Sequence, residues 1–191
     1  MKKLITISLV ALMLGATTVA QEQGRGKKSK FQVSFGYPLG THGSATDFIN
    51  EISFNILYGF NGGVDGFEYG GIFNYNSGNV KGFQMAGIAN INKGKTEGFQ
   101  MSGISNINML DTKGFQLSTT NFTLGHLEGI QLGVINVAKK VKGFQIGVIN
   151  YRENDDNGLS LGLLNIIKNG YYVAETTTGE VLYANSTLFL N

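Results

Sequence analysis

The chain has 191 residues, of which 28 are glycine, one is proline and none is cysteine. Glycine at this frequency disfavours long helices, since each interior helical glycine costs about 1 kcal/mol, and a chain without cysteine has no disulfides or thiolate metal sites. Without Lys2 and Lys3 of the expected leader, 15 − 2 = 13 basic residues face 13 acidic ones, so the mature chain lacks the positive charge that nucleic-acid binding requires.

The N-terminus has the three-part layout of a secretory signal peptide. Two lysines precede an apolar run from Leu4 to Leu14, and small residues lead up to Gln21. That run is too short and wrongly flanked for a membrane-spanning helix. We therefore expect a signal peptide over residues 1–20, a polar linker over 21–30 and a single β-repeat domain over 31–191.

Alternating apolar and polar residues predict two strands at the start of this domain, because period two places one face of a strand against a core. Glycine and proline mark the connections, and a second pair of apolar segments near the C-terminus predicts a terminal hairpin. The predicted strands are Phe31–Tyr37 and Glu51–Tyr58, the connections are a loop over Pro38–Asp47 and a turn over Gly59–Asp65, and the hairpin joins Tyr171–Thr177 to Val181–Leu190.

Residues 66–169 form an array of seven copies of one phrase, which reads Gly-Phe-Gln at its start in four copies, reads Gly-Phe-Glu, Gly-Ile-Gln or Gly-Leu-Ser in the other three, and closes on an asparagine. The starts lie 16, 16, 16, 15, 14 and 15 residues apart, so one short structural unit is repeated along the chain. The copies begin at Gly66, Gly82, Gly98, Gly114, Gly129, Gly143 and Gly158.

Charged residues gather once per unit, which favours one charged turn and one uninterrupted strand in each copy. Eleven residues span roughly 36 Å, or about 28 Å when tilted, which matches the apolar band of an outer-membrane barrel. We therefore favour an antiparallel up-and-down β-barrel, or a barrel-like meander, of about eleven short strands. Alternation assigns to a lumen or polar stripe Gln84, Gln100, Gln116, Gln131 and Gln145, and to a lipid-facing side Phe83, Phe99, Phe115 and Phe144.

A parallel β-solenoid with coils of 14–16 residues is the alternative. Adjacent copies are nearly identical, and in a solenoid their aligned side chains would stack into ladders. From Gly114 onward the distance from glycine to asparagine is one residue shorter, which would flip a barrel strand unless a bulge intervened, whereas a solenoid loses a residue at a turn freely. The second turn would fall at the midpoint glycines Gly87, Gly103, Gly133, Gly147 and Gly162.

The units resemble those of a family of exported surface-repeat proteins of Gram-negative bacteria, known from spirochaetes and Bacteroidetes, which read Gly-x-Gln-x-Gly-x-x-Asn. Gly129–Asn136 and Gly143–Asn150 match this phrase closely, and the resemblance covers about Phe31 to Leu190. It implies an envelope protein, exported to the outer membrane or cell surface, without an established activity. It also implies that related chains continue with further strands where this chain stops. Eleven strands are an odd number for a bacterial barrel, and either truncation at the C-terminus or one strand outside the barrel would reconcile the two.

Residues able to carry catalysis or bind a metal are few. His126 and Glu128 could form half of a metal site, but a third ligand is lacking nearby, so a solvated turn is favoured. The carboxylates Asp47, Glu51, Asp65 and Glu68 cluster in sequence, yet three of them fall in or beside turns. No nucleophile elbow or phosphate-binding loop is present.

We therefore expect no enzyme, no catalytic or metal site and no cofactor. The expected function is that of an outer-membrane barrel with a structural, pore or surface-interaction role. The alternative is a secreted or surface-attached solenoid that binds a protein or glycan. Expected partners are outer-membrane lipid and a surface protein or glycan, but no nucleic acid.

Overall fold

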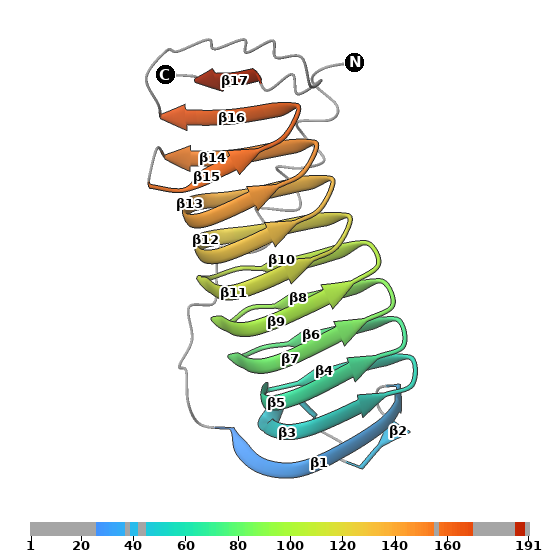
Figure 1. Ribbon diagram of the computed structural model, residues 1–191. Coiled ribbons are helices and arrows are strands. Elements are labelled where there is room, and N and C mark those ends of the chain that lie inside the picture. Colours follow the sequence, from blue (N-terminus) through green and yellow to red (C-terminus); the bar gives the residue numbers. More distant parts are fainter. Residues whose placement is uncertain (1–25, 37–38, 42–44, 155–156, 170–185, 190–191) are drawn as a thin grey trace, which may run out of the picture.

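The computed structural model is a parallel β-solenoid of about eight turns (Figure 1). It describes residues 26–36, 39–41, 45–154, 157–169 and 186–189. Within these ranges every strand pair is parallel except that of β1 with β2. The all-β prediction is confirmed, and of the two architectures the sequence left open the solenoid is present. The antiparallel barrel is wrong, and the pore role that depended on it is withdrawn.

Each coil contributes one strand to each of two faces, which we call the Gln face and the Asn face after their inward side chains. The Gln face contains β1 (Lys27–Gly36), β3 (Phe48–Asn55), β5 (Gly63–Gly70), β7 (Val80–Ala86), β9 (Thr96–Ser102), β11 (Thr112–Leu117) and β15 (Leu159–Leu161). The Asn face contains β4 (Tyr58–Asn61), β6 (Phe73–Asn76), β8 (Ala89–Asn92), β10 (Ser105–Asn108), β14 (Ile149–Asn154), β16 (Leu164–Asn169) and β17 (Ser186–Phe189). Two long strands, β12 (Thr120–Leu132) and β13 (Ile135–Ile146), pass from the Asn face of one coil to the Gln face of the next. The short β2 (Leu39–Gly40) and the 3₁₀ turn η1 (Ala45–Asp47) lie in the N-terminal part.

Two different turns close each coil. The charged turn leads from the Asn face to the Gln face of the next coil, as at Lys93–Lys95, and was expected from the sequence. The second, which we call the glycine bend, breaks each unit at its midpoint, as at Gly87–Ile88 between β7 and β8. One uninterrupted strand per unit was therefore wrong. The midpoint break also explains why the described residues form seventeen strands where about eleven were expected.

The shortened units lose their residue at the glycine bend. In the coil that starts at Gly98, residues 103 and 104 separate β9 from β10, and β11 ends one residue earlier, at Leu117. Both Gln100 with Gln116 and Asn106 with Asn121 therefore stay in register between the two coils. Because a turn absorbs the change, no side chain switches faces and no bulge within either strand is needed there.

A close approach of backbones requires the glycine at the head of each unit. Gly98 has a φ of 131°, a conformation that L side chains rarely adopt, and a Cβ at that position would overlap the carbonyl oxygen of Gly82. Gly114 stands in the same relation to Gly98. The first letter of the repeated phrase is thus fixed by coil-to-coil packing.

Several predicted segments have a different extent in the structure. β1 begins at Lys27, inside the segment expected to be a linker, and the predicted turn over Gly59–Asp65 is mostly strand. The segment predicted to be a signal peptide lies outside the described residues, as does the predicted terminal hairpin except for β17, which pairs in parallel with β16. Among the helices of the described part, none has the length and apolar character needed to cross a membrane.

Candidate functional site

The interior of the solenoid is built from amides. On the Gln face the side chains of Gln84, Gln100, Gln116, Gln131 and Gln145 are almost fully buried. Each donates from Nε2 to the preceding rung of the ladder, over distances such as 2.7 Å from Gln100 to Gln84 and 2.9 Å from Gln145 to Gln131. The glutamines assigned to a lumen or polar stripe therefore satisfy one another inside a closed core, where polar groups require partners.

A second ladder follows the Asn face and runs the other way. Asn90 donates from Nδ2 to Oδ1 of Asn106 at 2.9 Å, and Asn106 donates to Asn121 at 3.0 Å, so these amides point toward the C-terminal coils. The second Nδ2 hydrogen is also used, since Asn106 donates to the carbonyl of Leu117 across the bend. Each of these asparagines therefore links neighbouring strands of the Asn face. Asn106 also links the Asn face to the Gln face.

Glu68 occupies the glutamine position in the first unit and is the only carboxylate in this interior among the described residues. It is fully buried and accepts hydrogen bonds from Gln84 and Asn76, both at 2.8 Å, and from Asn61. Burial raises the pKa of this carboxyl from 4.5 to about 7, against the opposing effect of those bonds. Amide donors converge on it from coils on both sides, which only a residue with two acceptor oxygens can satisfy.

The other carboxylates of the sequence cluster lie elsewhere. Asp47, Glu51 and Asp65 are exposed on the outer surface, whereas Glu68 points inward. Glu68 is therefore separated from the other three by the wall of the solenoid. This arrangement gives no convergent acid–base pair that includes Glu68.

The outer surface of the Gln face carries stacked aromatic rings. The centroids of Phe67 and Phe83, Phe83 and Phe99, and Phe99 and Phe115 lie 5.5, 4.9 and 5.1 Å apart, with planes inclined by 2–6°. Phe144 lies in the same row two coils beyond Phe115 and is exposed. The phenylalanines assigned to a lipid-facing side thus all point away from the amide core.

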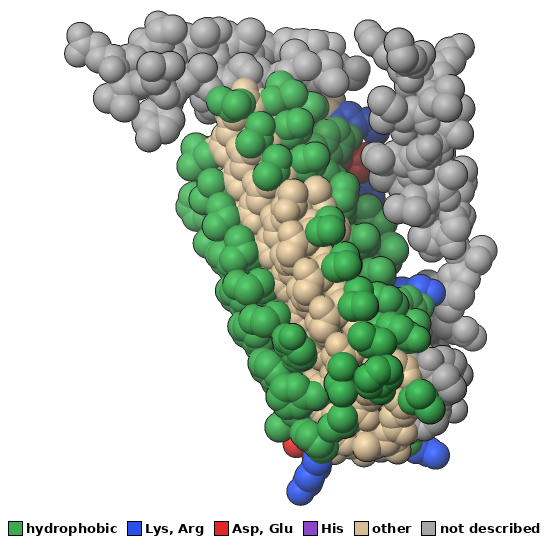
Figure 2. All heavy atoms as spheres, turned by 90° about the vertical axis from the view of Figure 1, so that its right-hand side faces the viewer, with side chains coloured by type: hydrophobic (Ala, Val, Ile, Leu, Met, Phe, Trp, Pro, Cys, Tyr) green, Lys and Arg blue, Asp and Glu red, His purple; other side chains and the backbone are tan. Residues whose placement is uncertain are grey.

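Two further apolar rows follow the glycine-bend edge, and Figure 2 shows columns of hydrophobic side chains along it, separated by a strip of backbone and other side chains. The strand-end row lies on the Gln face at the last outward-facing strand position before the bend, and its exposed members are Phe54, Tyr69, Leu132, Ile146 and Leu161. The bend row lies at the bend itself and consists of Ile56, Ile72, Ile88, Ile104, Val134, Val148 and Leu163, which are 36–63% exposed. The solenoid is therefore polar inside and apolar outside.

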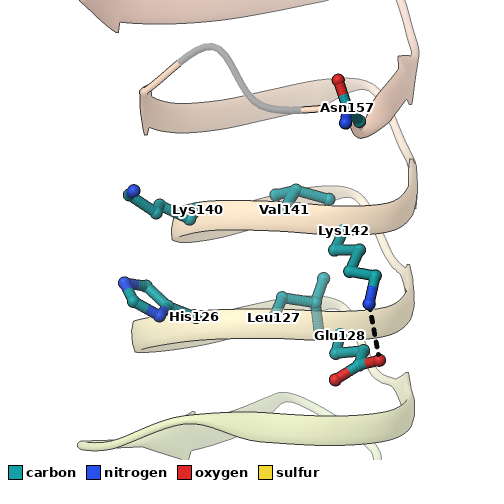
Figure 3. Close-up of a pocket in the computed structure, with 7 residues that line it drawn as sticks. All are labelled: His126, Leu127, Glu128, Lys140, Val141, Lys142 and Asn157. Carbon is teal, nitrogen blue, oxygen red and sulfur yellow. Dashed lines mark hydrogen bonds and ion pairs between the residues drawn. The ribbon is translucent and has the colours of Figure 1, made fainter.

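On the opposite edge, a shallow depression exposes mainly charged and polar side chains (Figure 3). In it Lys142 Nζ contacts Glu128 Oε1 at 3.1 Å, and this hydrogen bond lowers the pKa of the Glu128 carboxyl. The Nδ1 atom of His126 instead lies 3.9 Å from Oδ1 of Asp111. The same oxygen also accepts a hydrogen bond from the backbone N–H of His126. His126 and Glu128 have different partners, and over the described ranges no three metal-ligating side chains come together.

These features define a repeat protein of the parallel β-solenoid class. Comparisons with protein-family models, with curated proteins and with solved structures found no match.

Two features of the structure were not recognised from the sequence. Glu68 was named only as one of four clustered carboxylates, although its place at the glutamine position of the first unit could have indicated an inward-facing side chain. The bend row could have been recognised from the isoleucine or valine that follows the midpoint glycine in most units, at a place then assigned to the middle of a strand.

Proposed function

We propose that this chain is an exported, surface-attached β-solenoid of a Gram-negative cell envelope, with an interaction role and no catalytic activity. The leader-like layout of residues 1–20 supports export, and the resemblance of the repeats to exported surface-repeat proteins supports the envelope location. The glycine-rich coils form a repetitive scaffold, a construction typical of extended binding surfaces.

The main support for an interaction role is that polar side chains fill the interior while large apolar side chains lie on the surface. Amides that would ordinarily face water, such as Gln84 and Asn90, are fully buried, while Ile104 exposes 55% of its surface and Phe144 exposes 44%. Soluble monomers rarely expose contiguous apolar patches of more than a few hundred Å². A row repeated over several coils therefore supports binding of a partner that is itself apolar.

The stacked phenylalanines favour an apolar partner over a glycan. A sugar ring packs on the open face of an aromatic side chain. The faces of Phe83, Phe99 and Phe115 are directed at one another within the ladder, so their edges point outward.

Expression of the whole chain in a Gram-negative host tests export. We expect a product that begins at Gln21, fractionates with the envelope and is cleaved by protease added to intact cells. A chain without residues 1–20 is the control and should remain in the cytoplasm. An unprocessed cytoplasmic product from the full chain would overturn the proposal.

Binding of nonionic detergent micelles by the purified mature chain tests the apolar interaction. We expect bound detergent in light scattering combined with size-exclusion chromatography. A monomer that binds no detergent and no hydrophobic dye would contradict this part of the proposal.

A further inference from the structure

The glycine-bend edge is entirely uncharged across the coils. No Asp, Glu, Lys or Arg occurs in the eight segments that form it, residues 54–61, 69–76, 85–92, 101–108, 117–123, 132–138, 146–151 and 161–167. Charged side chains lie instead in or beside the charged turns, for example Lys81, Lys93, Lys113 and Lys140. One edge of the solenoid is thus suited to water and the other to an apolar medium.

Backbone N–H groups of the same edge donate to carbonyls of the neighbouring coil. The N–H of Ile88 donates to the carbonyl of Ile72 at 2.7 Å, that of Ile104 donates to Ile88 at 2.9 Å, and that of Val148 donates to Val134 at 2.9 Å. Inside hydrocarbon each unpaired backbone group costs several kcal/mol, so only structures with internally paired backbones tolerate it. The N–H groups named here meet that condition even though they lie between the strands.

The same two features argue against a protein or a glycan as the occupant. A protein interface combines an apolar centre with a polar rim and makes about one hydrogen bond per 100–200 Å². The bend row has no charged side chain, and the backbone donors and acceptors described above are already bonded to neighbouring coils. Acyl chains need no such bonds.

We propose that the bend row inserts into the acyl region of a lipid bilayer, with the solenoid lying along the membrane surface and its charged turns in water. The rungs Ile72, Ile88 and Ile104 stand one coil apart, so successive side chains are spaced about 4.8 Å along the bilayer plane. An interfacial element of this kind binds through its buried apolar area. This inference rests on the proposed function and specifies its partner.

Two fluorescent labels test the orientation, and the absence of native cysteine makes each label unique. An environment-sensitive dye is attached to the mature chain at Ile88→Cys on the bend edge or at Lys113→Cys on the charged edge. With phosphatidylcholine vesicles we expect a several-fold rise in emission and a blue shift at position 88, and little change at 113. Equal responses, or a response at 113 alone, would overturn the inference.

Substitutions test the energetic origin of binding. Replacing Ile72, Ile88 and Ile104 together by serine should weaken vesicle co-sedimentation at least tenfold, with circular dichroism confirming the fold. The matched control replaces Lys81, Lys113 and Lys140 by serine and should stay within twofold of the native chain. A larger loss in the control would show that charge drives binding and would overturn the inference.

The remaining outcomes separate this inference from the proposed function. A chain that is exported and binds detergent, but not vesicles, retains the proposed interaction role and refutes lipid docking. A rise in dye emission at position 88 with protein concentration, without vesicles, would show that a second copy covers the edge and would also refute it. A cytoplasmic, unprocessed chain would refute the proposed function itself.

Discussion

Gln84 donates a 2.8 Å hydrogen bond from Nε2 to Oε2 of Glu68, so the glutamine ladder begins on a buried carboxylate. The Nε2 atoms of Gln84 and Gln100 both point toward the N-terminal coils. The N-terminal end of the glutamine ladder therefore presents an N–H donor. Glu68, whose ionised carboxylate can only accept hydrogen bonds, lies at that end.

The first prediction concerns the pH dependence of stability through Glu68. Its pKa is raised from 4.5 to about 7 in the folded chain, chiefly by burial. Between these values the folded protein holds a proton that the unfolded chain releases, so the free energy of unfolding falls as pH rises. This contribution to stability is fully present below pH 4.5 and is lost as the pH rises from 4.5 to about 7. It amounts to roughly 3 kcal/mol.

Urea unfolding at pH 4.5, 6 and 8 measures this effect, with Glu68→Gln as the comparison. The substitution should flatten the curve over this window, because the amide does not titrate. Identical pH profiles for the two proteins would show that another group is responsible.

The second prediction concerns the asparagine ladder. Asn106→Ala removes the acceptor of Asn90 and the donor to Asn121 and to the Leu117 carbonyl. Because the groups left behind are buried, unfolding should become easier by roughly 2–5 kcal/mol. The neighbouring Ser105→Ala, on the outer surface, should change stability by less than about 0.5 kcal/mol. Chemical denaturation of both variants decides the point, and equal effects would argue against a structural ladder.

The third prediction concerns the glycine that begins each unit. Gly98→Ala places a Cβ against the Gly82 carbonyl oxygen and forces alanine to a φ of 131°. We expect a loss of roughly 3 kcal/mol or more, or failure to fold. Glu97→Ala, one residue earlier and exposed, is the control and should melt within a few degrees of the native chain. If the Gly98→Ala protein had the native melting temperature, neighbouring coils could move apart to accept the Cβ without loss of stability, and the prediction would be wrong.

The fourth prediction concerns the phenylalanine ladder. Phe99→Ser removes two ring contacts, with Phe83 at 4.9 Å and Phe115 at 5.1 Å, and should destabilise the fold by about 1–3 kcal/mol beyond the lost burial. Phe144 lies between Ile130 and Leu159 in the paired strands, so both of its described neighbours in the row are aliphatic. Phe144→Ser should therefore cost clearly less in thermal unfolding, and a larger loss at position 144 would refute a stabilising stack.

The all-β class and the repeating unit could be predicted from the sequence, because alternation and period are local properties. Strand direction could not, since a strand with Phe83 on one side and Gln84 on the other has the same pattern in a barrel and in a solenoid. Counting charged turns favoured the barrel, because the glycine bend at Gly87 carries no charge and resembled the middle of a strand. The near-identity of adjacent copies and the shortened units from Gly114 onward were the observations that favoured the correct alternative.

The candidate site was harder to predict, because its function depends on which surface each row occupies. The sequence assigns Phe99 and Gln100 to opposite sides of one strand, but it does not show that the rings stack at 5 Å or that the glutamines enclose a core. The surroundings of Glu68 are formed by residues from several coils, so they can be known only from the register between those coils.

The opposed directions of the two amide ladders bear on how long such a protein can become. Aligned amides in a single ladder would add their dipoles, and the axial field would grow with every coil. Here the Gln84–Gln145 and Asn90–Asn150 columns are antiparallel, so their moments largely cancel within each turn. Coils can therefore be inserted by duplication of a unit without accumulating electrostatic strain, so the dipoles of the ladders set no limit on the length of the rod.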